Sequence, residues 1–167
     1  MSTPNNEVLI TRSFNYPREV VFQAWTSPAE LKRWFAPRNC TISFSKLDIR
    51  TGGEFHWCVR NPKYPDCWCI GVFLEVVFPE RIKYSIQLAD EEGNAIEPFE
   101  AFKDKDWPKE TVVTVSFKDR NGNTELTIHQ TVPEVIAKKT GAYQSWIEQL
   151  EILEEILEAT TVIGNRP

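Results

Sequence analysis

The stretch FNYPREVVFQAWTSPAELKRWFAP, from Phe14 to Pro37, places two short helical patterns back to back near the N-terminus. Proline is favoured at the first position of a helix, so Pro17 and Pro28 are each expected to open one. Ser27 can cap the second helix, and Glu30 can complete a capping box. The two helices carry several large aromatic residues, which predict either a packed layer over a core or a roof over a cavity: Phe22, Trp25, Trp34 and Phe35.

Outside this stretch the apolar pattern has a period of two, which is typical of strands. Short polar connections between consecutive segments predict an antiparallel meander, and the Asn121-Gly122 pair is the clearest hairpin signal. Between two of the segments, residues 61–66 (NPKYPD) are expected to form a loop because they contain two prolines. The predicted strands cover residues 7–14, 40–50, 54–60, 67–78, 80–90, 111–119 and 124–132.

An amphipathic pattern predicts one long helix from Lys138 to about Thr160. A sheet of this length must bury one face, and this helix is the one predicted element long enough to cover it. The order of elements therefore predicts an α+β helix-grip fold, in which an antiparallel sheet of about seven strands curves around the long C-terminal helix. The two short helices lie between strands one and two. A length of 167 residues favours a single domain over 1–167, with a core of about 8–160.

The opening stretch also resembles the N-terminal signature of the activator of heat-shock-protein-90 ATPase homologue-like family. That family belongs to the START-like (SRPBCC, birch-pollen-allergen-like) superfamily. The matching positions are Phe14, Pro17, Val21, Phe22, Trp25, Thr26, Pro28, Trp34, Phe35 and Pro37.

Three further pieces are similar to the family, in the same order along the chain. They are Asp48-x-Arg50-x-Gly52-Gly53, then Thr124-x-Leu126-x-Ile128-x-Gln130, and then Gly141 with Trp146, Leu150, Leu153 and Leu157. The chain departs from the family pattern at Gly141-Ala142-Tyr143, where a Gly-Trp pair is common. The resemblance implies the helix-grip fold. Its superfamily includes lipid carriers, plant hormone binders, aromatic polyketide cyclases and a chaperone co-regulator.

Charge and hydropathy exclude several classes of function. The net charge of −5 argues against a nucleic-acid partner, because phosphate binding needs clustered Lys and Arg. The sequence has no apolar run of membrane-spanning length and no signal segment, so we expect a cytoplasmic protein without a membrane span. A domain of this size with a strand-rich outer face often pairs, which makes a homodimer an expectation.

The leading interpretation is non-enzymatic binding of a small hydrophobic or amphipathic ligand, without a cofactor, in a cavity between the sheet and the C-terminal helix. The alternatives are a protein-interaction module that regulates a chaperone ATPase, and a polyketide cyclase-like enzyme. The aromatic segment 91–110, with Phe99, Phe102 and Trp107, is expected to act as a lid. The expected ligand-binding residues are Trp25, Trp34, Phe35, Phe55, Trp57, Trp68, Ile70, Tyr143, Trp146 and Leu150.

Cysteines near the 61–66 loop suggest a second, less favoured site. If the loop pairs Arg60 with Cys67, then Cys58 lies opposite Cys69. Alternation would then place one imidazole and three thiols on the outer face of the sheet: His56, Cys58, Cys67 and Cys69. Such a set could hold a soft metal ion, or the opposed pair could form a cross-strand disulfide. The spacing matches known zinc sites poorly, and half-buried structural cysteines are the simpler alternative, so no metal is predicted.

Overall fold

A computed structural model of the protein describes residues 6–98 and 106–164, except for the side chains of 161–164. The predicted lid aromatics Phe99 and Phe102 lie outside these residues. The described elements, in chain order, are β1 (Glu7–Phe14), α1 (Arg18–Thr26), α2 (Pro28–Trp34), β2 (Thr41–Leu47), β3 (Glu54–Asn61), β4 (Tyr64–Val77), β5 (Arg81–Ala89), β6 (Thr111–Arg120), β7 (Asn123–Pro133), α4 (Glu134–Thr140) and α5 (Ala142–Gly164).

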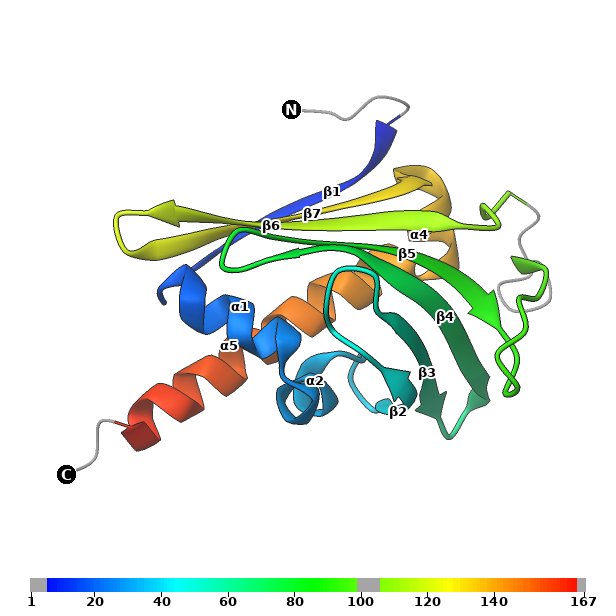
Figure 1. Ribbon diagram of the computed structural model, residues 1–167, viewed down its shortest axis with the longest axis horizontal. Helices are drawn as coiled ribbons and strands as arrows, with labels where there is room; N and C mark the ends of the chain where they lie inside the picture. The colour runs from blue at the N-terminus through cyan, green and yellow to red at the C-terminus, as the bar shows by residue number, and fades with distance from the viewer. Residues whose placement is uncertain (1–5, 99–105, 165–167) are drawn as a thin grey trace.

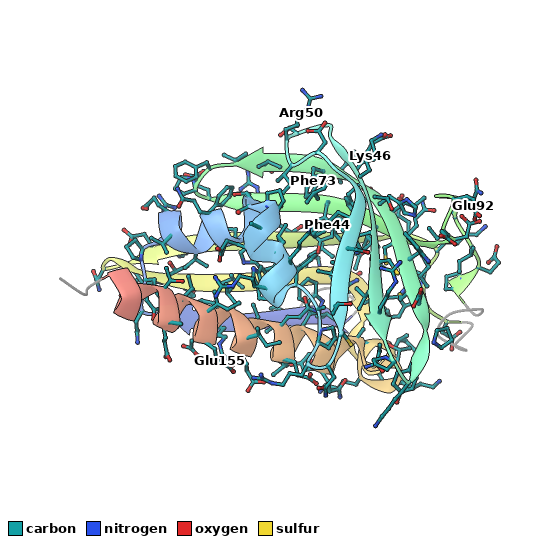
Figure 2. The ribbon with its side chains drawn as sticks, turned by 90° about the horizontal axis from the view of Figure 1, so that it is seen from below. Phe44, Lys46, Arg50, Phe73, Glu92 and Glu155 are labelled. Carbon is teal, nitrogen blue, oxygen red and sulfur yellow. The ribbon has the colours of Figure 1, made fainter. Side chains whose placement is uncertain are left out.

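The strands form a 7-stranded antiparallel sheet in the order β1-β7-β6-β5-β4-β3-β2. The sheet curves from β1 and β7 down to β2, and α5 lies along its concave side (Figure 1). Viewed from below, α5 and the α1–α2 pair lie across the same face of the sheet (Figure 2). This arrangement confirms the predicted helix-grip fold. No helix in the described part of the chain is long and apolar enough to cross a membrane.

The second of the two N-terminal helices begins where the sequence predicts, whereas α1 begins at Arg18, one residue after Pro17, which lies at its N-cap. The Ser27 hydroxyl accepts a hydrogen bond of 3.4 Å from the backbone N–H of Glu30, and Pro28 is the first residue of α2. The indole Nε1 of Trp34 donates a 3.0 Å hydrogen bond to the Ala24 carbonyl, so the second helix is tied back to the first. This hydrogen bond joins the two helices where they pack over the sheet.

The Asp48-x-Arg50-x-Gly52-Gly53 piece forms the turn between β2 and β3. Gly52 has a φ of +88°, a left-handed conformation that favours glycine. The backbone N–H of Gly52 donates to the Phe73 carbonyl at 2.7 Å, and the Phe73 N–H donates to the Gly53 carbonyl at 2.8 Å. Arg50 projects from this turn, away from the body of the protein (Figure 2). The motif therefore docks the turn onto β4.

The predicted pairing of β3 with β4 is wrong by one residue. The connection is much tighter than the expected 61–66 loop, because Asn61 already pairs with Tyr64. A β-bulge then lies between Val59 and Asn61, and Val59 pairs with Cys67. A slip of one residue moves every side chain of a strand to the opposite face of the sheet. This shift rearranges both predicted sites.

The predicted long C-terminal helix is interrupted near its start. Gly141 has a φ of +90° and ends α4, and α5 begins at the next residue. A left-handed glycine is a common end for a helix, so the helical pattern that begins near Lys138 belongs to two helices. The break lets α5 start at a new angle against the sheet, beside the cavity described next.

Candidate ligand-binding cavity

A cavity of about 410 Å³ lies between the sheet and the first turns of α5. Pro37, Tyr64, Pro65 and Trp107 contribute to its lining from loops and from the start of β4. Of the predicted lid segment 91–110, Trp107 lines this cavity. The strands and α5 supply most of the remaining wall: Val59, Cys67, Cys69, Tyr84, Ile86, Leu88, Thr111, Val113, Gln130, Ala142, Ser145, Trp146 and Gln149.

One wall of the cavity carries a chain of buried hydrogen bonds. The indole Nε1 of Trp146 donates to Oε1 of Gln130 at 3.0 Å, and Nε2 of Gln130 donates to Oγ1 of Thr111 at 3.1 Å. Gln130 and Thr111 are 7% and 2% exposed. A buried amide is costly unless it is hydrogen-bonded, and here both ends of the Gln130 amide are satisfied. The chain fixes the orientation of the amide at the cavity wall.

Tyr84 supplies a different kind of polar group. Its side chain is 3% exposed and lines the cavity, and no hydrogen bond joins its hydroxyl to another described residue. Burial, with a smaller contribution from Cys69, raises the pKa of the Tyr84 phenol far above its ordinary value. The phenol therefore stays neutral and can donate a hydrogen bond to a molecule in the cavity.

Two thiols from β4 also line the cavity. Cys67 is half-buried and Cys69 is buried, and both line the cavity. Hydrogen bonding from Cys69 lowers the pKa of Cys67. The same interaction, followed by burial, raises the pKa of Cys69 well above its ordinary value. Cys67 is the more acidic and more accessible of the pair.

The aromatics that were expected to line a cavity mostly fill the core instead. Trp25 packs against Trp34 at 4.7 Å between ring centroids, and against Trp146 in a stacked arrangement at 6.2 Å. Phe35 meets Trp57 edge to face at 5.2 Å. Phe55 and Trp57 stack at 3.9 Å. Aromatic pairs at these separations pack favourably, so this end of the interior between the sheet and the helices is closed.

Ten residues were expected to bind the ligand, and of these ten, Trp146 alone lines the cavity. Leu150 is fully buried in the core one turn further along α5. Tyr143 lies beside Lys138, whose ammonium nitrogen is 4.9 Å from the centroid of the Tyr143 ring. The prediction that Trp68 and Ile70 point inward is wrong, because Trp68 pairs with Cys58 and Ile70 with His56, on the convex face.

The predicted cysteine and histidine cluster is divided by the sheet. Trp57, not Cys58, lies opposite Cys69, and the register shift places Cys67 and Cys69 on the concave face. His56 remains on the convex face, where it packs against Trp68 at 4.9 Å. No group of three or more metal-ligating side chains occurs within 6–98 and 106–160. The opposed Cys58–Cys69 pair that a cross-strand disulfide would need does not form.

Sequence reasoning missed most of the cavity wall, although a signal was present. Gln130 alternates with the apolar Leu126 and Ile128, so the same pattern that points these two inward points a polar amide inward. On the helix, Ala142, Ser145 and Gln149 share a face with Trp146 at helical spacing. Small and polar residues on the inner face of both layers indicate the place where the two layers do not fill the space between them.

Comparisons with known proteins agree with this architecture. A family model described as "Activator of Hsp90 ATPase homolog 1-like protein" matches residues 15–158. No curated protein matches the chain. A solution structure from Staphylococcus epidermidis is 24% identical with a TM-score of 0.75, and covers 93% of this chain and 91% of its own.

Two further structures share the fold at lower identity. A protein from Arthrobacter aurescens is 20% identical with a TM-score of 0.76, over 90% of this chain and 85% of that one. An AHSA1 protein from Silicibacter pomeroyi is 17% identical with a TM-score of 0.72, over 92% of this chain and 99% of that one. With the family match over residues 15–158, this chain belongs to the Activator of Hsp90 ATPase homolog 1-like protein family.

Proposed function

We propose that the protein binds a small, mostly apolar molecule in the cavity between the sheet and α5, without transforming it. The observation that carries the proposal is a cavity of about 410 Å³ with the unpartnered hydroxyl of Tyr84 in its wall. Binding sites for small molecules are commonly about 300–1,000 Å³, with apolar walls and a few fixed polar groups. The cavity has this size and this chemistry.

The lining favours a neutral ligand. Within the described residues, the lining contains no Asp, Glu, His, Lys or Arg side chain. A charged ligand would therefore lose its hydration without gaining an ionic partner, which is unfavourable in an apolar site. Tyr84 can donate one hydrogen bond, so a carbonyl or ether oxygen on the ligand would be satisfied there. We infer a neutral molecule with an apolar body and one hydrogen-bond acceptor.

The same lining favours binding over cyclase-like catalysis. General acid–base catalysis needs a group that titrates near the working pH and lies within reach of the substrate. The described wall offers amides, hydroxyls, a phenol that burial keeps neutral and two thiols, of which Cys67 alone has a lowered pKa. A thiolate at Cys67 is suited to bond formation with a soft centre and not to the acid–base chemistry of a cyclase. His56 faces the convex side, and His129 bonds to Glu7 at 2.9 Å. Neither histidine is among the residues that line the cavity.

A protein partner is the second candidate, because the family description names an activator of a chaperone ATPase. The supporting observation is a group of exposed apolar side chains at the β4–β5 turn, Leu74, Val77 and Phe78. Exposed apolar patches often mark protein contacts. If this candidate holds, the protein will change the ATPase rate of purified Hsp90, and Phe78→Ser will abolish the change. An unchanged ATPase rate at saturating protein would contradict it.

The leading proposal is tested with N-phenyl-1-naphthylamine, a neutral apolar dye whose fluorescence rises in apolar surroundings. We expect saturable binding at one site, which Ala142→Trp blocks by filling the cavity from the start of α5. The matched control is Gln144→Trp, an exposed position in the same helical turn, which should bind like the unchanged protein. Equal binding by both variants, or none by the unchanged protein, would contradict the proposal.

Native mass spectrometry complements the dye experiment. A mass excess that disappears on denaturation would identify a molecule that copurifies with the protein, and its mass would restrict the ligand class. The same spectrum reports whether the protein is the homodimer expected from its sequence. The cytoplasmic location expected from the sequence belongs to the same proposal and is tested by fractionation of the source cells.

A further inference from the structure

Cys67 and Cys69 are two thiols that the proposed ligand-binding role does not require. They alternate along β4, so both side chains lie on the concave face and both line the cavity. Residues two apart on a strand are separated by about 6.6 Å between Cα atoms. This separation is within the range of up to about 6.8 Å at which two cysteine side chains can be bridged. The pair can therefore act together on one atom.

We propose that Cys67 and Cys69 form a dithiol site that captures a trivalent organoarsenical, with its organic group in the cavity. The proposal rests on the proposed function, because it places its ligand in the same cavity. Soft thiolates select soft, thiophilic centres. An aryl arsenic(III) centre already has one As–C bond, so two sulfur atoms complete its three bonds. No third ligating side chain from the protein is needed.

The chemistry is a condensation and not a redox reaction. With phenylarsine oxide, each sulfur forms one bond to arsenic, and the bonds between arsenic and oxygen break. The oxygen leaves as water with the two thiol protons, and arsenic remains trivalent. Hydrogen bonding from Cys69 lowers the pKa of Cys67, which increases the fraction of the attacking thiolate. Cys69 then closes the ring as an intramolecular step.

Two features of the wall favour this ligand over a metal ion. The described residues provide no third metal-ligating side chain near the pair, whereas structural zinc takes four ligands. A single copper(I) ion between two thiolates would leave a net negative charge among apolar groups, which is unfavourable. The adduct of the phenylarsenic group with the two cysteine sulfurs is neutral, and its phenyl ring would contact Val59, Ile86 and Leu88 of the same wall.

The simpler explanation for the two cysteines is that they serve as small apolar residues, which is common for buried thiols. That explanation predicts no special reactivity toward a dithiol reagent. The other two cysteines provide internal controls. Cys40 accepts a 3.4 Å hydrogen bond from Asn61 at its sulfur, and Cys58 is fully buried, and neither lines the cavity.

The test is titration of the full chain with phenylarsine oxide, read out by intact mass and peptide mapping. We expect one phenylarsenic group per chain, bridging Cys67 and Cys69. Cys67→Ser and Cys69→Ser should each weaken binding by about 100-fold, because the second As–S bond is intramolecular. Cys40→Ser and Cys58→Ser should bind normally. No adduct on the unchanged protein, or an adduct that forms as tightly in Cys67→Ser and Cys69→Ser as in the unchanged protein, would overturn the proposal.

A second measurement needs no substitution and so does not depend on the folding of a variant. The adduct on the unchanged protein should be reversed by 2,3-dimercaptopropanol, and should resist the same concentration of thiol supplied as 2-mercaptoethanol. Reversal by both reagents would indicate a single As–S bond and would overturn the dithiol site. Failure of this site is distinguishable from failure of the proposed function, because the naphthylamine dye reports on the cavity without any thiol chemistry.

Discussion

The indole nitrogen of Trp146 donates a hydrogen bond of 3.0 Å to the amide oxygen of Gln130, across the interface between α5 and β7. The Gln130 amide in turn donates to Thr111 on β6 at 3.1 Å. One side chain thus ties the start of the long helix to two strands. Because the amide is already bonded at both ends, the Tyr84 hydroxyl is the more available polar group for a ligand.

Replacement of Gln130 by leucine should reduce the free energy of unfolding. The substitution keeps a side chain of similar size but removes both hydrogen bonds, and it leaves the Trp146 N–H without its acceptor. An unsatisfied buried group costs about 1–3 kcal/mol. Urea unfolding monitored by circular dichroism measures the change.

The double variant Gln130→Leu with Trp146→Phe is the control for this interpretation. Removing both partners should cost less than the sum of the two single substitutions, because no buried donor remains unpaired. Strict additivity of the two changes in free energy would show that the hydrogen bond contributes nothing beyond the packing of each side chain.

Alanine at Gly71 should destabilise the fold. The aromatic ring of Phe55 lies over Gly71 on the neighbouring strand, and a Cβ atom at this position would overlap both that ring and the Ser85 carbonyl oxygen. Overpacking of this kind typically costs about 1–3 kcal/mol. The measurement is the thermal unfolding midpoint, compared with the unchanged protein.

The companion variant for Gly71→Ala is Phe55→Leu in the same chain. A leucine at position 55 removes the overlap with the ring. Adding Gly71→Ala to the Phe55→Leu variant should therefore lower the unfolding midpoint by less than Gly71→Ala lowers it in the unchanged protein. If Gly71→Ala unfolds at the same temperature as the unchanged protein, the close approach of Phe55 to the β4 backbone is not a constraint on the sequence.

Much of the fold was predictable from local signals. The Ser27-Pro28 start of α2, the turn that contains Gly52 and the Asn121-Gly122 hairpin are each determined by a few neighbouring residues. Such signals require no knowledge of the rest of the chain. The antiparallel pairing of β2 to β5, and of β6 with β7, follows from such signals, because short connections force consecutive strands to be neighbours. The pairing of β1 with β7 joins the two ends of the chain and is not determined by local signals.

The candidate site was harder to predict because it depends on register. The bulge between Val59 and Asn61 shifts the pairing of β3 with β4 by one residue, and this shift exchanges Trp68 and Ile70 for Cys67 and Cys69 on the concave face. Nothing in the alternation of β4 itself distinguishes its two faces, because both carry apolar side chains. The position of the cavity also depends on the break at Gly141, which sets where α5 begins.

Alanine at Ser27 should weaken the junction of the two N-terminal helices. The Ser27 hydroxyl accepts a hydrogen bond from the Glu30 N–H, and loss of such a cap typically costs about 0.5–2 kcal/mol. Ser27→Asp keeps an acceptor at the same place and should retain most of the stability. Chemical unfolding measures the stability of both variants. Equal losses of unfolding free energy in Ser27→Ala and Ser27→Asp would show that the hydroxyl is not acting as a cap.

The reactivity of Cys67 should have an unusual dependence on pH. The folded-state pKa of this thiol is lowered, chiefly by the hydrogen bond from Cys69, so the thiolate forms at a lower pH in the folded than in the unfolded protein. The rate of alkylation by iodoacetamide, resolved by peptide mapping, should therefore reach half its maximum at a lower pH for Cys67 in the folded protein. Cys69→Ala removes the donor and should move this midpoint upward. Cys69→Ser retains a donor and should keep the midpoint closer to that of the unchanged protein. An identical midpoint in Cys69→Ala and the unchanged protein would mean that Cys69 does not stabilise the thiolate.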